Sequence, residues 1–565
     1  MYIYSVISFP KSQTDMLRFF KSLGRGVIRD IRNRWPHYGS DFSDAYDYRV
    51  IPSTIYIFFT NLLPAIAFAQ DMFDRTDNLY GVNEVLMSSA LAGVVFGLLA
   101  GQPLCIVGVS GPIAIFSYTV YELMHPRGTP YFPFMCWIYL WLMVMHVVVA
   151  MLNWVSFLRI ISNFSCEVFG FFINIVYCQK AVQILDRQFA QVGVASGFCS
   201  VTIALLMVIF GLGSSIFGSQ LHYFKPWFRK FFLDYGVPLA VIFFTGFIHF
   251  GGYLDDVHFA HLPTTGAFQP TAHGPERPHG WFIHFWPKEN IDVGDVFLAI
   301  PYAILLTFLF YFDHNVSSLM CQLKDYPLKK PASFHWDFML LGITTGISGI
   351  LGIPAPNGLI PQAPLHTSSL VVHDLSTGKP LSVVEQRLTN TLQGAMTFVM
   401  MSGPFLTVLG LIPQAVLAGL FLIMGIGGLH GSPVVNKIRF IFLDKDYITH
   451  DPECPQLWKD LNAIPPSKKK WFYVYLGLQV IAGLAEFIIT LTKGAVGFPG
   501  VLMFFALCAK WVWPKIIPPE DLEYLDGAVA EEFIVKSLEV PKLRPEKQHD
   551  FEMDMISSST ERREQ

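Results

Sequence analysis

The stretch "GILGIPAPNGLIPQAPLHTSSL", residues 349–370, does not fit a continuous helix, although it is apolar enough to be buried. It holds four prolines within eleven residues, namely Pro354, Pro356, Pro361 and Pro364. Each proline in a helix interior costs about 3 kcal/mol. The composition therefore predicts that the chain is unwound here, between ordered segments on either side.

The rest of the chain indicates where such a break would be buried. The chain has 565 residues, of which 52% are hydrophobic and 15% are charged. Its mean hydropathy of +0.43 predicts a polytopic membrane protein surrounded by lipid. The eight cysteines show no CxxC or Cys/His metal spacing, so we expect free thiols and neither a metal nor a cofactor. No nucleic-acid partner is expected.

The number of membrane segments follows from the apolar runs, because a helix needs about 20 residues to cross a bilayer. Two of the fourteen predicted segments are short or broken, 102–121 and 354–372. The twelve longer runs are 52–73, 84–101, 131–154, 157–177, 192–216, 236–251, 295–321, 334–353, 392–412, 413–429, 471–492 and 496–514.

Basic residues predict the orientation, because cytoplasmic loops are enriched in Lys and Arg. With fourteen segments the main basic clusters fall on one side, which we assign to the cytoplasm. Residues 1–50 and 517–565 are then cytoplasmic, and 252–294 is an extracellular loop. Five histidines in that loop lack helical ligand spacing, which favours an irregular polar loop over a metal site. Lys180 and Arg187 lie on the outer side and contradict the rule.

A second broken segment, "GQPLCIVGVSGPIAIF" at 101–116, lies in the first half of the chain. Gly108 is 56 residues after the start of the first span at Pro52, and Ile353 is 58 residues after Asp295. Matching breaks in two halves are typical of inverted-repeat transporters with a site at the membrane midplane. The alternative is a pair of ordinary proline kinks.

The two breaks predict an anion site without a charged side chain. A restarted half-helix presents free N–H groups and the positive end of its dipole. Pro361 and Pro364 are tolerated there, because the first turn of a helix needs no N–H from proline. No Lys or Arg occurs in the spans that we expect nearest the site, which favours a weakly ionised solute; these spans are 52–73, 84–121, 295–321 and 341–372.

An acid lies within the apolar run "FLAIPYAILLTFLFYFDHNVSSLM", residues 297–320. A charge at the centre of a membrane helix costs about 2.5–3.5 kcal/mol on insertion scales, so Asp313 should face a cavity and act in ion coupling. The alternative is a structural acid paired with a neighbouring helix. His314 points about 100° away from Asp313 on a helix. It is either a proton relay or a packing residue.

The chain resembles the solute-carrier family of bicarbonate transporters and anion exchangers, specifically its borate-transporter branch. The resemblance covers about residues 34–515 and rests on motifs in matching order. These are "RWPHYGSDFSDAYDYR" (34–49), "LLPAIAF" (62–68), "QPLCIVGVSGP" (102–112), "FYFDHNVSSL" (310–319), "KKPASFHWDFMLLG" (329–342), "GIPAPNGLIPQAPLHTSSL" (352–370), "EQRLTNTLQG" (385–394) and "IPQAVLAGLFLIMG" (412–425).

The resemblance implies an all-α transporter domain over about 51–516, with fourteen segments in a seven-plus-seven inverted repeat. A core domain would comprise about 51–154 and 295–412, and a gate domain about 155–251 and 413–516. It also implies a homodimer joined through the gate. Residues implied in substrate binding are Gln70 on the first segment, Val109, Ser110 and Gly111 at the first half-helix, and Asn357, Gly358 and Gln362 at the second.

The implied function is export of borate across the plasma membrane by alternating access, with Asp313 in the place of the family's functional acid. Exchangers of chloride and bicarbonate typically carry an arginine where this chain has Gln362, and this difference favours borate. A vacuolar or other internal membrane remains open. The alternatives are a bicarbonate or other anion exchanger, an anion channel and, least favoured, an intramembrane enzyme, since no catalytic nucleophile constellation is evident.

Overall fold

The computed structural model of the chain is mostly helical. It describes residues 22–526 together with 534, 537 and 538, apart from gaps at 222, 255, 275–276, 279, 324–325, 374–379, 445–446, 449–455, 464, 466–467 and 493. The start of the predicted basic N-terminus and most of the predicted tail therefore lie outside the described residues.

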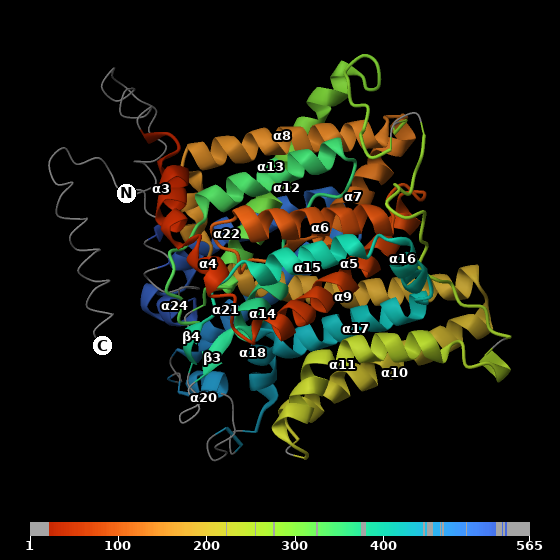
Figure 1. The fold of residues 1–565 in the computed structure, drawn as a ribbon. Coiled ribbons are helices and arrows are strands. Elements are labelled where there is room, and N and C mark those ends of the chain that lie inside the picture. Colours follow the sequence, from red (N-terminus) through yellow and green to blue (C-terminus); the bar gives the residue numbers. More distant parts are fainter. Residues whose placement is uncertain are drawn as a thin grey trace.

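The helices and strands follow one another along the chain as in Figure 1. Their bounds are α3 (Arg25–Arg34), α4 (Ser40–Ser43), α5 (Val50–Arg75), α6 (Val82–Leu99), β1 (Val107–Gly108), α7 (Gly111–Met124), α8 (Tyr131–Met151), α9 (Asn163–Gln191), α10 (Val194–Ser219), α11 (Pro226–Phe247), α12 (Val293–Met320), α13 (His335–Ile350), β2 (Asn357–Gly358), α14 (Gln362–Ser369), β3 (Val371–His373), β4 (Pro380–Val383), α15 (Leu388–Val399), α16 (Gly403–Gly410), α17 (Gln414–Gly431), α18 (Pro433–Phe442), α20 (Gln456–Asn462), α21 (Lys469–Thr490), α22 (Phe498–Trp511), α23 (Trp513–Ile516) and α24 (Pro519–Leu525).

Ten helices in the described part of the chain are long and apolar enough to cross a membrane, or eleven if α15 and α16 count as one bent span. Among the other predicted segments, α13 has 16 residues, α7 has 14 and α14 has 8. These three are shorter than a full crossing. The fold is that of a helical membrane protein, and the count of fourteen in two repeats stays a prediction.

Three predicted spans differ from the structure. The run 236–251 is displaced, since α11 begins at Pro226 and ends at Phe247. The run 392–412 is not one helix, because α15 and α16 meet at 81°. Ser402 is extended between them, and Pro404 lies in the first turn of α16, where proline favours a new start. The run 157–177 is displaced and lengthened, since α9 begins at Asn163 and continues to Gln191. Lys180 and Arg187 are therefore helical residues rather than loop residues.

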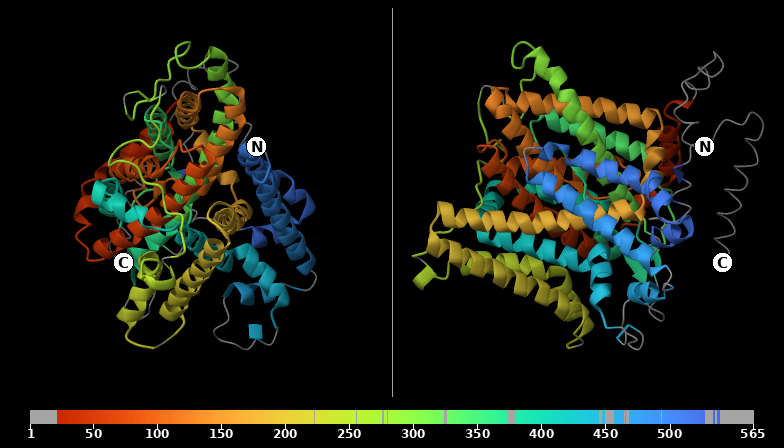
Figure 2. Two further views of the ribbon diagram at one scale, coloured as in Figure 1. Left: turned by 90° about the vertical axis from the view of Figure 1, so that its right-hand side faces the viewer. Right: turned by 180° about the vertical axis from the view of Figure 1, so that it is seen from behind.

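The long helices form two groups that pack mainly within themselves. The first group contains α5, α6, α8, α12, α13 and α15, and the second contains α9, α10, α11, α17 and α21. In Figure 1, α3 and α24 lie at the left end of the bundle, whereas the connection from α11 to α12 crosses its right end. Figure 2 shows the same arrangement from the side and from behind, with α10 and α11 at the periphery.

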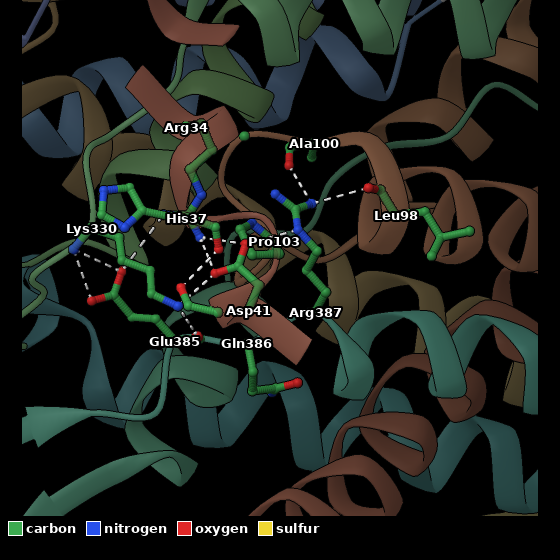
Figure 3. A network of polar contacts seen from close by, with 12 residues as sticks. Arg34, His37, Asp41, Leu98, Ala100, Pro103, Lys330, Glu385, Gln386 and Arg387 are labelled. Atoms are coloured by element: carbon green, nitrogen blue, oxygen red, sulfur yellow. Dashed lines mark hydrogen bonds and ion pairs between the residues drawn. The ribbon is translucent and has the colours of Figure 1, made fainter. Parts of the chain in front are cut away.

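A buried charge cluster fixes the left end of the first group (Figure 3). The Asp41 carboxylate lies 2.9 Å from Arg34 Nη2, 2.7 Å from Lys330 Nζ and 2.8 Å from Arg387 Nε. Arg387 Nη1 also donates to the Ala100 carbonyl over 2.6 Å, at the C-terminus of α6. The cluster joins the segment before α5 to the ends of α6 and α15, and so holds the frame around the broken segments.

Candidate functional site

The two broken segments meet as a short antiparallel ladder. Val107 pairs with Gly358 and Gly108 pairs with Asn357, and the Leu359 N–H donates to the Ile106 carbonyl over 2.9 Å. Unwound backbone inside a membrane protein must satisfy its polar groups internally. The ladder does so for both halves at once, and it confirms the predicted proximity of the two breaks.

A helix restarts after each strand of the ladder. Helix α7 begins at Gly111, directly after the extended N-cap residue Ser110. The Ser110 hydroxyl makes no capping bond and is buried without a hydrogen-bond partner. Helix α14 begins at Gln362 after Pro361, and Pro364 lies in its first turn. Pro112 and Pro364 each remove one backbone donor from these first turns. The Ala363 N–H already donates to the Leu359 carbonyl over 3.0 Å. Among the described residues, the donors left for an anion are the N–H groups of Gly111, Ile113 and Gln362.

The ladder is joined to α12 through Asp313. Asn357 Nδ2 donates to Asp313 Oδ2 over 3.0 Å, and Asn357 Oδ1 accepts the Gly358 N–H over 2.8 Å. Asp313 is 2% exposed and Asn357 is fully buried. The second carboxylate oxygen of Asp313 has no hydrogen-bond partner. A buried polar atom without a partner points to a ligand, a proton or a water.

Gly358 is required at its position because α12 approaches it closely. A Cβ atom at residue 358 would lie 2.7 Å from the Cα of His314 and 2.9 Å from the Cβ of Ser317. Neither neighbour can move away without shifting α12. Gly358 therefore permits a close approach of two backbones, and its part in substrate binding stays a prediction.

His314 points away from Asn357. Its ring packs edge-to-face on Phe96 of α6, with 5.4 Å between the ring centroids, and neither ring nitrogen has a hydrogen-bond partner. The divergence from Asp313 follows from helical geometry. A relay role for His314 stays a prediction.

A chain of amide side chains that the sequence reasoning missed supports the ladder. Asn61 Nδ2 on α5 donates to Gln393 Oε1 over 3.0 Å, and Gln393 Nε2 donates to Asn390 Oδ1 over 3.0 Å. Asn390 Nδ2 in turn donates to the carbonyls of Pro103 and Cys105, both over 3.1 Å. Amides at positions 390 and 393 in an apolar helix were the available signal, because such side chains need buried partners.

The other predicted binding residues have separate partners. The Val109 N–H donates to Ser89 Oγ over 3.3 Å. Gln362 Nε2 donates to the Thr60 carbonyl over 3.4 Å, and its Oε1 has no partner. Gln70 Nε2 donates to Asp74 Oδ1 over 2.9 Å, and its side chain makes no hydrogen bond to the ladder among the described residues. Helix α5 therefore contacts the second tip through Thr60, whereas the Gln70 side chain bonds within α5 itself.

An aromatic wall stands against the first tip, and nothing in the sequence patterns indicated it. A Cβ atom at Gly111 would lie 3.0 Å from Phe68 Cζ and 3.6 Å from Tyr177 Cε1. The Phe68 ring lies 5.9 Å from the Tyr177 ring and 5.2 Å from the Phe421 ring, between centroids. These rings come from α5, α9 and α17, so both helix groups close around Gly111.

The expected absence of cations near the first half-helix needs a correction. Lys180 enters from α9, is 2% exposed, and donates through Nζ to the Tyr118 hydroxyl of α7 over 2.8 Å. The sequence reasoning considered only the spans nearest the breaks, and α9 was not among them. The Lys180 charge is balanced by Asp71 at 2.9 Å. The buried Lys180–Asp71 pair therefore brings no net charge to the first half-helix.

The sequence comparisons identify the family. Residues 21–202 and 195–530 match the family described as the HCO3⁻ transporter integral membrane domain. The chain belongs to this family. A member from Saccharomyces cerevisiae named boron transporter 1 is 51% identical over 94% of this chain and 90% of its own length. A Schizosaccharomyces pombe protein named putative transporter C543.05c is 48% identical over 91% of this chain and 97% of its own length.

More distant members of the HCO3⁻ transporter family are larger. The rat band 3 anion transport protein is 26% identical over 92% of this chain, which spans 56% of the length of that relative. Among solved structures, the transmembrane domain of the cyanobacterial bicarbonate transporter BicA has 14% identity and a TM-score of 0.49, covering 78% of this chain and 97% of its own. Family membership makes the protein a multi-pass membrane transporter.

Proposed function

We propose that the protein is a secondary active transporter that exports borate across the plasma membrane by alternating access. The observation that carries this proposal is the β1–β2 ladder flanked by two helix starts and by buried, unpartnered oxygens of Ser110, Asp313 and Gln362. The 51% identity to the protein named boron transporter 1 over 94% of the chain supports borate as the solute.

The chemistry of tetrahedral borate suits this arrangement. The anion carries one charge and four hydroxyls, and it is a minor species near neutral pH because boric acid is neutral there. Each helix N-terminus stabilises an anion by up to about 2 kcal/mol in partly buried geometry. Gln70, Val109, Ser110, Gly111, Asn357, Gly358 and Gln362 are the proposed binding residues. Asp313 binds the coupled proton or cation, because an unprotonated carboxylate would repel the substrate.

Alternating access requires two parts that move against each other. We assign about 51–154 and 295–412 to a core that carries both half-helices, and about 155–251 and 413–516 to a gate. The two helix groups, which pack mainly within themselves, support this division. The proposal includes fourteen segments in two inverted repeats, a homodimer joined through the gate, and both termini in the cytoplasm, as the basic residues favour.

The test is boron flux through purified protein in lipid vesicles, with pH and sodium gradients varied separately. We expect boron movement that saturates and that follows one of the two gradients. Vesicles without protein and vesicles with the Asp313→Asn variant are the matched controls. Chloride-dependent bicarbonate flux without boron movement would identify an anion exchanger instead. Currents far above turnover-limited flux would identify a channel.

A further inference from the structure

Four ionised side chains join α5 to α9 near the last turns of α5. Lys180 Nζ lies 2.9 Å from Asp71 Oδ2, and Arg187 Nη2 lies 3.5 Å from Asp71 Oδ1. Arg187 Nη1 lies 2.6 Å from Asp74 Oδ2. The two acids belong to the proposed core and the two cations belong to the proposed gate.

The inner pair of this cluster is buried. The side chains of Asp71 and Lys180 are 1% and 3% exposed, whereas those of Asp74 and Arg187 are 20% and 22% exposed. Removing one partner of a buried pair strands the other charge, which is strongly unfavourable. Lys180 also donates to Tyr118, so the same ammonium contacts both α5 and α7.

The cluster connects the proposed core to the proposed gate. Among the ion pairs formed by the described residues, only those of Lys180 and Arg187 join the core helices to the gate helices. At the other end of α9, Glu167 pairs with Lys437 of α18, within the gate. The charge cluster around Asp41 lies within the first helix group and its flanking segments. Within the part of the chain that the structure describes, these ion pairs tie the two groups together near the last turns of α5.

The cluster is also connected to the candidate site through α5. Gln70, one residue before Asp71, donates to Asp74 over 2.9 Å. Phe68, two residues earlier, lies against Gly111 at the first helix tip. A movement that separates α5 from α9 must therefore break the ion pairs and shift the aromatic wall together.

We propose that Asp71, Asp74, Lys180 and Arg187 form an outer latch that holds the extracellular side closed and must open before the solute is released. This inference rests on the alternating-access function proposed above. Charges that pair in a dry interior attract strongly, but they are well hydrated once water enters, where an exposed pair contributes little. The ion pairs therefore stabilise the closed state strongly. Once water hydrates the separated charges, the pairs contribute little to reclosing.

The latch also explains why Lys180 and Arg187 contradict the charge rule for membrane orientation. Each cation at the outer end of α9 is matched by a carboxylate on α5. The two charges are retained because they pair across the moving interface, rather than because they set the orientation of the chain.

The experiment measures access from outside the cell to a cysteine introduced at Ser110, using a membrane-impermeant maleimide on the full chain. The protein without Ser110→Cys gives the background from native thiols. We expect Arg187→Gln and Asp74→Asn to speed labelling about tenfold, which corresponds to a 1.4 kcal/mol shift toward the open state. The charge-reversed pair Asp74→Arg with Arg187→Asp should restore slow labelling.

A matched control comes from Arg75, one residue beyond Asp74. It pairs with Glu122 at 2.5 Å, but both residues lie on core helices, so Arg75→Gln should leave the labelling rate unchanged. Unchanged labelling in Arg187→Gln, or equal acceleration in Arg75→Gln, would overturn the latch. Boron flux by the parent protein in vesicles distinguishes the two proposals. If the parent protein moves boron but Arg187→Gln does not change the labelling rate, the latch is wrong and the proposed transport function stands.

Discussion

The side-chain amide of Asn357 donates to the carboxylate of Asp313 over 3.0 Å, which ties the second strand of the ladder to the C-terminal half of α12. One oxygen of the carboxylate is occupied by this bond, and the other has no partner. The acid is thus held at the ladder in one orientation with a free site for a proton or a ligand. Replacing Asp313 by asparagine therefore removes the carboxylate while keeping the size of the side chain.

The first prediction follows from that contact. Asp313→Asn keeps the volume of the side chain but carries no exchangeable charge, so we expect cells that express the variant to retain boron like cells without the transporter. The measurement is internal boron after loading, with surface protein quantified in parallel. His314→Gln is the comparison, because the His314 ring packs on Phe96 and only its backbone lies against the ladder. Normal boron export by Asp313→Asn at normal surface levels would remove the coupling role.

The second prediction tests the packing of the ladder against α12. In Gly358→Ala the added Cβ would lie 2.7 Å from the Cα of His314, and overpacking of this kind costs about 1–3 kcal/mol. We expect a lower unfolding temperature in detergent. Gly213→Ala in α10, where a Cβ atom meets nothing within 4 Å, should be neutral or slightly stabilising. Equal melting of the two variants would contradict the close approach.

These contacts show which parts of the site could be anticipated. Proline and glycine in apolar runs are local signals, and they correctly indicated that residues 101–116 and 349–370 are broken. Asp313 was recognisable because a charge in a long apolar run is costly and therefore indicates a functional or paired residue. Pairing between the breaks was expected from repeat symmetry, whereas the register of Gly108 with Asn357 depends on three-dimensional packing.

The third prediction concerns selectivity. Gln362 begins α14 and has an unpartnered Oε1. Gln362→Arg places a permanent positive charge at the second tip, which should shift transport from borate toward permanently charged anions such as chloride and bicarbonate. Competition of these anions with boron flux in vesicles is the measurement, with Gln362→Met as the uncharged control. Unchanged selectivity in the arginine variant would count against a site at this tip.

The fourth prediction concerns the charge cluster at the left end of the bundle. Arg387→Met removes a cation that lies 2.8 Å from Asp41 and that bonds to the end of α6. Breaking a buried network in this way costs about 3–5 kcal/mol, so we expect a large fall in melting temperature and in yield. Arg49→Gln breaks a partly exposed local pair with Asp47 and should change stability by less than about 1 kcal/mol.

The fifth prediction is a pH dependence carried by His37, which precedes α5. Burial, reinforced by the cations of Arg34 and Lys330, lowers the pKa of His37 below its ordinary value of 6.5. The unfolded chain therefore takes up a proton more readily, and stability is lost as the pH falls through about 6.5 toward the lower folded-state pKa. Melting temperatures between pH 8 and 5 should fall less in His37→Gln. Parallel curves for the two proteins would show that other groups dominate.

Other features could not be predicted because they depend on partners distant in sequence. The run 392–412 was predicted as one span, because a Gly-Pro pair within an apolar run does not determine the angle between α15 and α16. Lys180 was treated as an exception, because its acid lies more than a hundred residues earlier at Asp71. The wall of Phe68, Tyr177 and Phe421 combines residues from three helices, and aromatic residues are common throughout this chain.

The β1–β2 ladder has a consequence for biosynthesis. Val107 has no strand partner until Gly358, about 250 residues later, has left the ribosome. At about 5–20 residues per second, the first broken segment waits at least about ten seconds with unpaired backbone. The nascent first half must therefore be sheltered by the insertion machinery or by water until the second half arrives. Truncated chains ending before residue 357 should be recognised and degraded by membrane quality control.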